Sequence, residues 1–298
     1  MKALPLYLAL FLSTTIVAQS SSNLRRVQRE AEKVIDLTST LIDGVTTYEK
    51  AKKMRPVIQE QFDTWRKAKR TFARLDEEPE QALLEVVYTQ LGDIVEASSG
   101  PLKDWLEEDP RGNYNYQYLS LCRTGIEKIY EAMETYATTY DINTRTSDVQ
   151  ERFEAQVALM QYTADMNAGA APVDSIVAFI KAEIGTTDID KLFSAQKSLI
   201  KALSVQLRGY GDEAFYEGDG DLYYAYQKYY EELLELATAD LLADFTKMKY
   251  DLVELRSIAG STEASAEKTL SFFDNEKRLL AKREARFVKH NLPKAPKK

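Results

Sequence analysis

Apolar residues return at alternating three- and four-residue intervals along much of the chain, the spacing that lines one face of an α-helix. The clearest run occupies the a and d positions of a coiled-coil-like seam, and its members are Leu24, Val27, Ala31, Val34, Thr38, Leu41, Val45 and Tyr48. The sequence shows no sustained period-two alternation between turn residues, the pattern of a half-buried strand. We therefore predict an all-α fold, an elongated antiparallel bundle of long amphipathic helices.

Glycine and proline are scarce and mark the predicted helix ends, with 12 Gly and 8 Pro in 298 residues. Pro56 is expected to kink or restart the first helix, because an interior proline loses one backbone hydrogen bond and clashes with the preceding turn. Ser147 is a predicted N-cap, with Gln150 at capping-box spacing. The further predicted helices cover residues 58–75, 80–97, 116–140, 147–166, 174–184, 188–208, 221–258 and 263–290.

The first residues have the layout of a cleavable signal peptide. Met1 and Lys2 precede an almost unbroken apolar stretch, 3–18, and the chain then turns polar. Small residues at Ala18 and Ser20 suit removal there, so residues 1–20 are predicted as a signal peptide and the mature protein as secreted or periplasmic. An uncleaved anchor is the alternative interpretation. After residue 23 the sequence contains no other apolar run of the roughly 18 residues that a spanning helix needs.

The glycines Gly209, Gly211, Gly218 and Gly220 form the one dense cluster of that residue and indicate a hinge. The predicted organisation is an N-terminal helical region over 21–208, a Gly-rich hinge over 209–220, a C-terminal helical hairpin over 221–292 and a basic tail over 293–298. The sequence shows no fixed repeat period.

Composition and charge exclude several classes of function. The formal net charge is −8, and loss of Lys2 with the signal peptide leaves 38 basic against 47 acidic residues, or −9. This sign argues against a nucleic-acid partner. The single Cys122 excludes an internal disulfide, and one His, His290, together with one Cys cannot assemble Cys/His zinc sites, Glu-x-x-His di-iron motifs or a catalytic triad. We expect no cofactor and no metal.

Acidic residues near the glycine cluster resemble a calcium loop only superficially. Glu217, Asp219 and Asp221 alternate with glycines, but the sixth position is Leu222 rather than Gly and the twelfth is Lys228 rather than Glu. A solvated turn and a helix N-terminus, where Asp219 and Asp221 complement the macrodipole, is the preferred interpretation over a weak cation site.

Tyrosine is abundant, with 18 residues in the chain, and it is concentrated in two clusters. Tyr223, Tyr226 and Tyr230 share a helix face and are predicted as core or helix-interface residues, with Tyr224 pointing elsewhere. The other cluster is in a predicted loop and is the candidate contact for a partner protein or a glycan, with the residues Arg111, Asn113, Tyr114, Tyr116 and Tyr118. We predict no catalytic residues.

Two further segments permit membrane contact. The apolar segment 168–185 suits either an insertion hairpin of a pore-forming protein or a buried short helix, and Asp174, Lys181 and Glu183 favour the buried helix. The basic C-terminus, 277–298, could touch an anionic envelope surface. A solvated chain end is the competing interpretation.

The segment behind the signal peptide reads Val45, Thr46, Thr47, Tyr48, Glu49, Lys50, Ala51, Lys52 and Lys53. It resembles the exported helical subunits of conjugative type IV secretion systems over the first third of the chain. The resemblance implies a role in an envelope assembly and transfers no functional residue. We therefore predict an exported, non-catalytic interaction or scaffold module with a protein partner. The alternatives are a membrane-active or pore-forming helical protein and a glycan-binding protein or glycan hydrolase.

Overall fold

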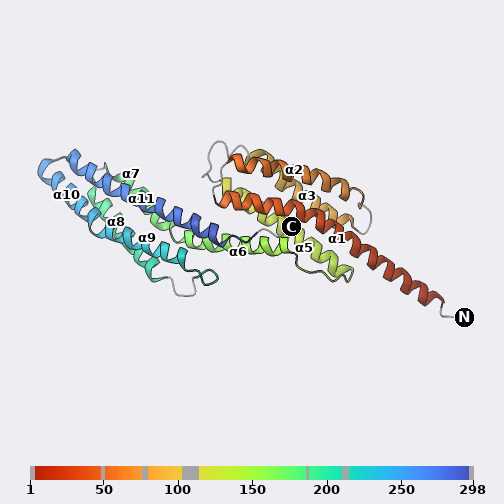
Figure 1. Ribbon diagram of the computed structural model, residues 1–298. Coiled ribbons are helices and arrows are strands. Elements are labelled where there is room, and N and C mark those ends of the chain that lie inside the picture. Colours follow the sequence, from red (N-terminus) through yellow and green to blue (C-terminus); the bar gives the residue numbers. More distant parts are fainter. Residues whose placement is uncertain are drawn as a thin grey trace. The chain divides into compact units, whose positions relative to one another are not determined.

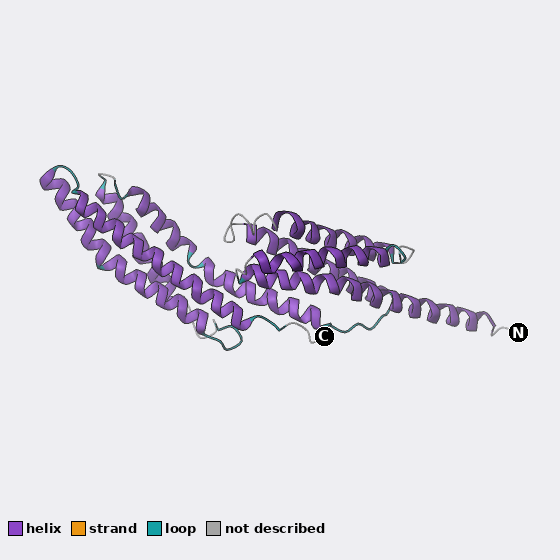
Figure 2. Cartoon of the chain, turned by 45° about the horizontal axis from the view of Figure 1, so that its top comes forward, coloured by secondary structure: helices purple, strands orange, loops and turns teal. Residues whose placement is uncertain are grey.

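The computed structural model describes residues 4–47, 51–75, 80–102, 114–185, 188–209 and 215–294. Every regular element in these ranges is helical, and the only β feature there is an isolated bridge between Tyr216 and Asp219 (Figure 2). The predicted all-α class is confirmed. The helices in chain order are α1 (Leu4–Thr46), α2 (Ala51–Phe72), α3 (Gln81–Ala97), the π-helical turn η1 (Ser98–Leu102), α5 (Tyr114–Thr139), α6 (Asp148–Ala168), α7 (Ala171–Glu183), α8 (Ile189–Arg208), α9 (Asp221–Thr238), α10 (Asp240–Leu255) and α11 (Gly260–Asn291).

The chain divides into two compact units, unit 1 with Met1–Val157 and Leu292–Lys298, and unit 2 with Ala158–Asn291. The division falls inside α6 and not at the Gly-rich segment 209–220. The physical reason is that α8, before that segment, packs against α9 after it, so both belong to unit 2. Residues 215–220 form a tight turn in which Gly218 has a φ of +87°.

In unit 1, α1 packs against α2, α3 and α5, which lie side by side in Figure 1. The predicted seam is the buried face of α1 from Leu24 to Val45, while Tyr48 lies outside the described residues. Burying a Val or Leu side chain contributes about 1.5–3 kcal/mol. The one hydroxyl in the seam, Thr38, donates to the Val34 carbonyl and accepts from Gln61 of α2, both at 2.8 Å.

The predicted restart at Pro56 is wrong. The first helix ends at Thr46, and Pro56 lies in the second turn of α2. The hydroxyls of Thr46 and Thr47 donate to the carbonyls of Ile42 and Asp43 in the last turn, and the Asp43 carbonyl also accepts from the backbone N–H of Thr47. Pro56 costs α2 only the bond to the carbonyl of Lys52, which is exposed and can be hydrated.

In unit 2, α9 packs against α8, α10 and α11, and α7 packs against α8. Tyr223, Tyr226 and Tyr230 are buried and Tyr224 is exposed, as predicted from their spacing. The segment 168–185 contains α7, which buries Val173, Val177 and Ile180 in the manner of a short core helix. Among the described residues, no helix combines the length and the apolar character needed to cross a bilayer.

The predicted single helix over 221–258 is divided at Ala239, where φ is −102° and ψ is −72°. The predicted C-terminal hairpin therefore contains three helices, α9, α10 and α11. The side-chain amide of Gln196, on α8, donates to the carbonyl of Ala237 at 2.7 Å. A side chain that enters the backbone ladder is a known cause of helix breaks, and this one comes from a distant part of the sequence.

The predicted N-cap at Ser147 is confirmed, whereas the predicted capping box with Gln150 is not formed. The backbone N–H of Gln150 donates to Ser147 Oγ at 3.1 Å, as expected of an N-cap. The Gln150 side chain bonds to Glu154 instead of closing the capping box. At the start of α9, Asp219 accepts from the backbone N–H of Asp221, which agrees with the predicted helix N-terminus.

Candidate functional site

The structure places one of the five predicted contact residues in the core. Arg111 and Asn113 lie outside the described residues, and Tyr114 and Tyr116 belong to the first turn of α5. Tyr118 is 1% exposed, and its hydroxyl shares a 2.9 Å hydrogen bond with Ser98 Oγ. The loop prediction was wrong at Tyr118, because residues from 114 onward are helical and this position faces η1. Tyr118 therefore connects α5 to the C-terminal end of α3 by a hydrogen bond.

Next to this contact, α3 and α5 border an open groove, which we call the α3–α5 groove. It consists of two hollows, of about 700 Å³ and about 590 Å³, that share Gln90. The first is lined by Ala82, Leu83, Glu85, Val86, Thr89, Gln90, Lys128, Glu131, Ala132, Thr135, Tyr136, Thr139 and Tyr140. The second is lined by Gln90, Asp93, Ile94, Gln117, Ser120, Leu121, Thr124 and Gly125. The two helices thus frame a channel several turns long.

Short side chains and one glycine shape this groove. Ala132, Thr135 and Thr124 leave room above its floor, which includes the buried side chain of Ile94. A Cβ on Gly125 would lie 3.0 Å from Ile94 Cδ1. The absence of that Cβ lets α5 approach α3 closely at this point.

The charge of the groove lining is acidic. Glu85, Asp93 and Glu131 face a single lysine, Lys128, so the lining carries three negative charges and one positive charge. Such a surface attracts basic side chains over a Debye length of about 8 Å at physiological salt. A partner that fits the groove would therefore carry Lys or Arg beside its buried face.

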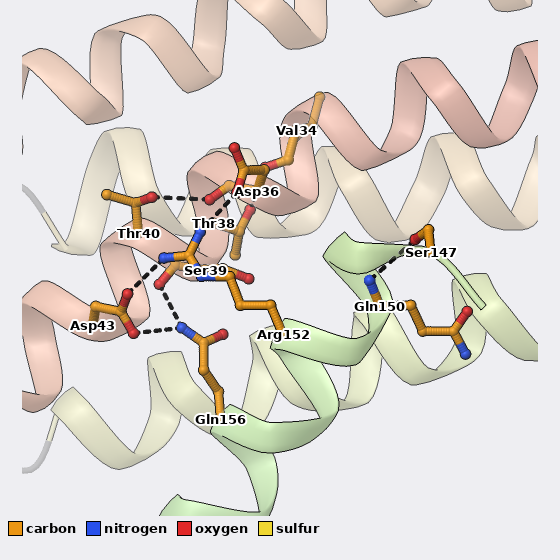
Figure 3. Close-up of polar contacts among 10 residues, drawn as sticks. All are labelled: Val34, Asp36, Thr38, Ser39, Thr40, Asp43, Ser147, Gln150, Arg152 and Gln156. Atoms are coloured by element: carbon orange, nitrogen blue, oxygen red, sulfur yellow. Dashed lines mark hydrogen bonds and ion pairs between the residues drawn. The ribbon is translucent and has the colours of Figure 1, made fainter. Parts of the chain in front are cut away.

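A buried ion cluster attaches α6 to α1 in unit 1, as Figure 3 shows. Arg152, 5% exposed, donates to Asp36 at 2.7 Å and to Asp43 at 2.6 Å. Gln156 donates to Asp43 and to the Ser39 carbonyl. Burial raises the pKa of Asp43, and Arg152 and Gln156 partly offset that rise. Arg152 binds both carboxylates and Gln156 binds Asp43, so these four residues, the Arg152 cluster, connect α6 to α1.

A second polar cluster joins α6, α9 and α11 in unit 2. Asn167 donates to Glu284 at 3.0 Å, and Tyr226 donates to Asn167 and, at 3.5 Å, to Glu284. Burial raises the pKa of Glu284, while the hydrogen bonds from Asn167 and Tyr226 oppose the rise. The neutral carboxyl is thus favoured more in the folded chain than in the unfolded chain.

Glu284→Gln is expected to raise the melting temperature of unit 2 by a few degrees at pH 7. Neutral Glu284 stabilises the fold fully below its ordinary pKa of 4.5, and this contribution is lost as the pH rises through the raised pKa. Gln keeps the side chain neutral at every pH. The increase in melting temperature should therefore vanish near pH 4, where Glu284 is neutral as well. Thermal unfolding followed by tyrosine circular dichroism measures it. The exposed Glu267→Gln is the control, and an equal gain there would contradict the prediction.

A further apolar surface lies on α10, where Leu242, Tyr250 and Val253 are exposed on one helix face. Among the residues that the structure describes, no group of three or more His, Cys, Asp and Glu side chains is arranged to hold a metal ion. No protein family model, curated protein or solved structure matches the chain.

The groove and the ion cluster were both missed at the sequence level. The groove had a visible signal, since a series at three- or four-residue intervals lies outside the main apolar seam, with the residues Gln117, Leu121, Thr124, Lys128, Glu131 and Thr135. The ion cluster had none, because Arg152 and its partners Asp36 and Asp43 are more than 100 positions apart.

Proposed function

We propose that the protein is an exported, non-catalytic interaction module of the cell envelope that binds one helix of a partner protein in the α3–α5 groove. The observation that carries this proposal is the groove itself, a channel along two packed helices with short side chains on its walls and an acidic lining. Helices recognise such channels by laying an amphipathic face between the two existing ridges.

The charge distribution specifies the occupant. Glu85, Asp93 and Glu131 outnumber Lys128 along the walls, so the fitting helix has small or apolar residues on its buried face and basic residues beside them. Export to the envelope is supported by the signal-peptide layout of residues 1–20 and by the resemblance to exported helical secretion subunits. An elongated antiparallel bundle would expose long grooves of this kind along its sides.

Site-specific photo-crosslinking tests the proposal. A photoreactive amino acid at Ala132, inside the groove, should capture one protein, and the crosslinked peptide should be a helical segment rich in Lys and Arg. The same group at Thr246, an exposed position on α10, should not capture it. Capture of the same protein from both positions, or of a peptide without basic residues, would contradict the proposal.

Charge reversal then checks that the groove provides the affinity. Glu131→Lys is expected to weaken binding of the captured helix several-fold, because two like charges then oppose each other across the interface. Glu134→Lys makes the same change on the exposed side of α5, outside the groove lining, and should leave the dissociation constant unchanged. Isothermal titration calorimetry at two salt concentrations gives the dissociation constants of both variants. Equal effects of the two variants would exclude the groove as the binding site.

A further inference from the structure

The packed part of α1 begins at the end of the predicted signal peptide. Ala18 and Gln19 are exposed, whereas Ser20 is 2% exposed and Leu24 is buried. Figures 1 and 2 show the first turns of α1 extending past the ends of α2, α3 and α5. The point at which α1 joins the core of unit 1 therefore coincides with the small residues that suit signal cleavage.

A polar cluster surrounds Ser20, and we call it the Glu80 cluster, with the residues Ser20, Asn23, Glu80 and Tyr136. The Glu80 carboxylate is 3% exposed. Its Oε1 accepts from Asn23 Nδ2 at 3.0 Å and from the Tyr136 hydroxyl at 2.7 Å. The Tyr136 hydroxyl also bonds with the Ser20 side chain, and burial raises the pKa of Tyr136 well above its usual range.

Among the described residues, both donors to the Glu80 carboxylate are neutral side chains. A buried carboxylate is costly unless a cation pairs with it. The titratable groups that act on Tyr136 are Glu80 and Tyr140, whose ring lies 4.7 Å from that of Tyr136. The Glu80 cluster thus has one charged member, a negative one, beside the bond that follows Ser20.

We propose that a signal peptidase hydrolyses the bond between Ser20 and Ser21 and that the new α-ammonium group of Ser21 pairs with Glu80. Water adds to the Ser20 carbonyl carbon, which leaves as the carboxylate of the released peptide, and the Ser21 nitrogen becomes the ammonium group. Ala18 and Ser20 supply the small residues that such peptidases need. This inference depends on the export included in the proposed function.

The ammonium group takes the place of the Ser20 hydroxyl. The Ser21 nitrogen is bonded to the Ser20 carbonyl carbon, so it lies next to the position from which Ser20 contacts Tyr136. Because Ser20 is buried within a helix, cleavage precedes the packing of unit 1. Maturation then completes the Glu80 cluster, and α1 starts with its positive end against a carboxylate.

The test uses the full chain exported through a secretion pathway. Intact mass is expected to show a chain that begins at Ser21. Reductive methylation with ¹³C-formaldehyde then gives the pKa of the α-amino group by NMR. It should exceed the ordinary 7.7–8.0 by about one unit or more, and Glu80→Gln should return it to that range. Glu85→Gln, an exposed position on α3, should leave it raised.

The pH dependence of stability has a defined sign. An α-amino group whose pKa is raised by folding stabilises unit 1 fully below about pH 8. This stabilisation is lost as the pH rises through the pKa of the amino group in the folded chain. If Glu80→Gln does not fold, a chain that begins at Ala18, an exposed position, keeps Glu80 and moves the ammonium group away. That chain should show an ordinary α-amino pKa.

The outcomes separate this inference from the proposed function. An exported chain that begins at a residue other than Ser21, or a Ser21 ammonium with an ordinary pKa, overturns the Glu80 pairing and leaves the groove proposal intact. A chain that keeps residues 1–20 overturns both the pairing and the export part of the proposed function. Failure of crosslinking at Ala132 overturns the helix-binding proposal alone.

Discussion

Arg152→Met is expected to lower the free energy of unfolding of unit 1 by about 3–5 kcal/mol, the cost of breaking a buried ion cluster from one side. Met keeps most of the side-chain volume and removes the charge. Asp36 and Asp43 would lose their shared cation, and Asp43 is already destabilised as an anion by burial. The remaining donor in the cluster, Gln156, is neutral.

Tryptophan fluorescence during urea unfolding measures this change, because the buried Trp65 lies on α2 in unit 1. Arg145→Met, at an exposed position before α6, is the matched control and should change the unfolding free energy by less than about 0.5 kcal/mol. Equal urea midpoints for the two variants would show that the Arg152 cluster does not hold α6 against α1.

The deficit of Arg152→Met should also depend on pH. Burial and the loss of the arginine both favour the neutral form of Asp43 in the folded chain. A carboxyl whose pKa is raised by folding stabilises the folded chain fully at a pH below its ordinary pKa of 3.8. This stabilisation is lost as the pH rises through the pKa of the folded chain. The difference between variant and original chain should therefore be smaller at pH 4 than at pH 7.

Features that depend on a single helix were predictable from the sequence. The seam from Leu24 to Val45, the Ser147 cap and the inward face of Tyr223, Tyr226 and Tyr230 all follow from three- and four-residue spacing, because each helix buries its own apolar face. Local hydrogen bonds of capping residues are similarly independent of the rest of the chain. The all-α class follows from these features alone.

Features that depend on contacts between distant segments were not predictable. Arg152 looks like an ordinary solvated charge until α6 lies against Asp36 and Asp43 of α1. Next to the break at Ala239, the carbonyl of Ala237 accepts from Gln196, which belongs to another helix. Tyr118 has a polar, glycine-containing segment before it, and its burial depends on the meeting of α5 and η1. Spacing along one segment contains no information about these neighbours.

Phe245→Ala is expected to destabilise unit 2 by about 3–5 kcal/mol, through lost burial and the cavity left behind. Phe245 is fully buried, and its ring meets the edge of Phe193 on α8 at 6.0 Å between centroids. The break at Ala239 means that α10 is not aligned by continuity with α9. Its position depends on the side chains it buries, of which Phe245 is the largest.

Hydrogen exchange detected by mass spectrometry tests this dependence segment by segment, since unit 2 contains no tryptophan. Backbone amides of α10 should lose more protection than those of α9, because α9 keeps its own buried tyrosines. Phe272→Ala removes the same ring at a position that is 43% exposed on α11 and should have little effect. Equal loss of protection in α9 and α10 would instead mean that the two helices form one cooperative rod, with the break at Ala239 having no energetic consequence.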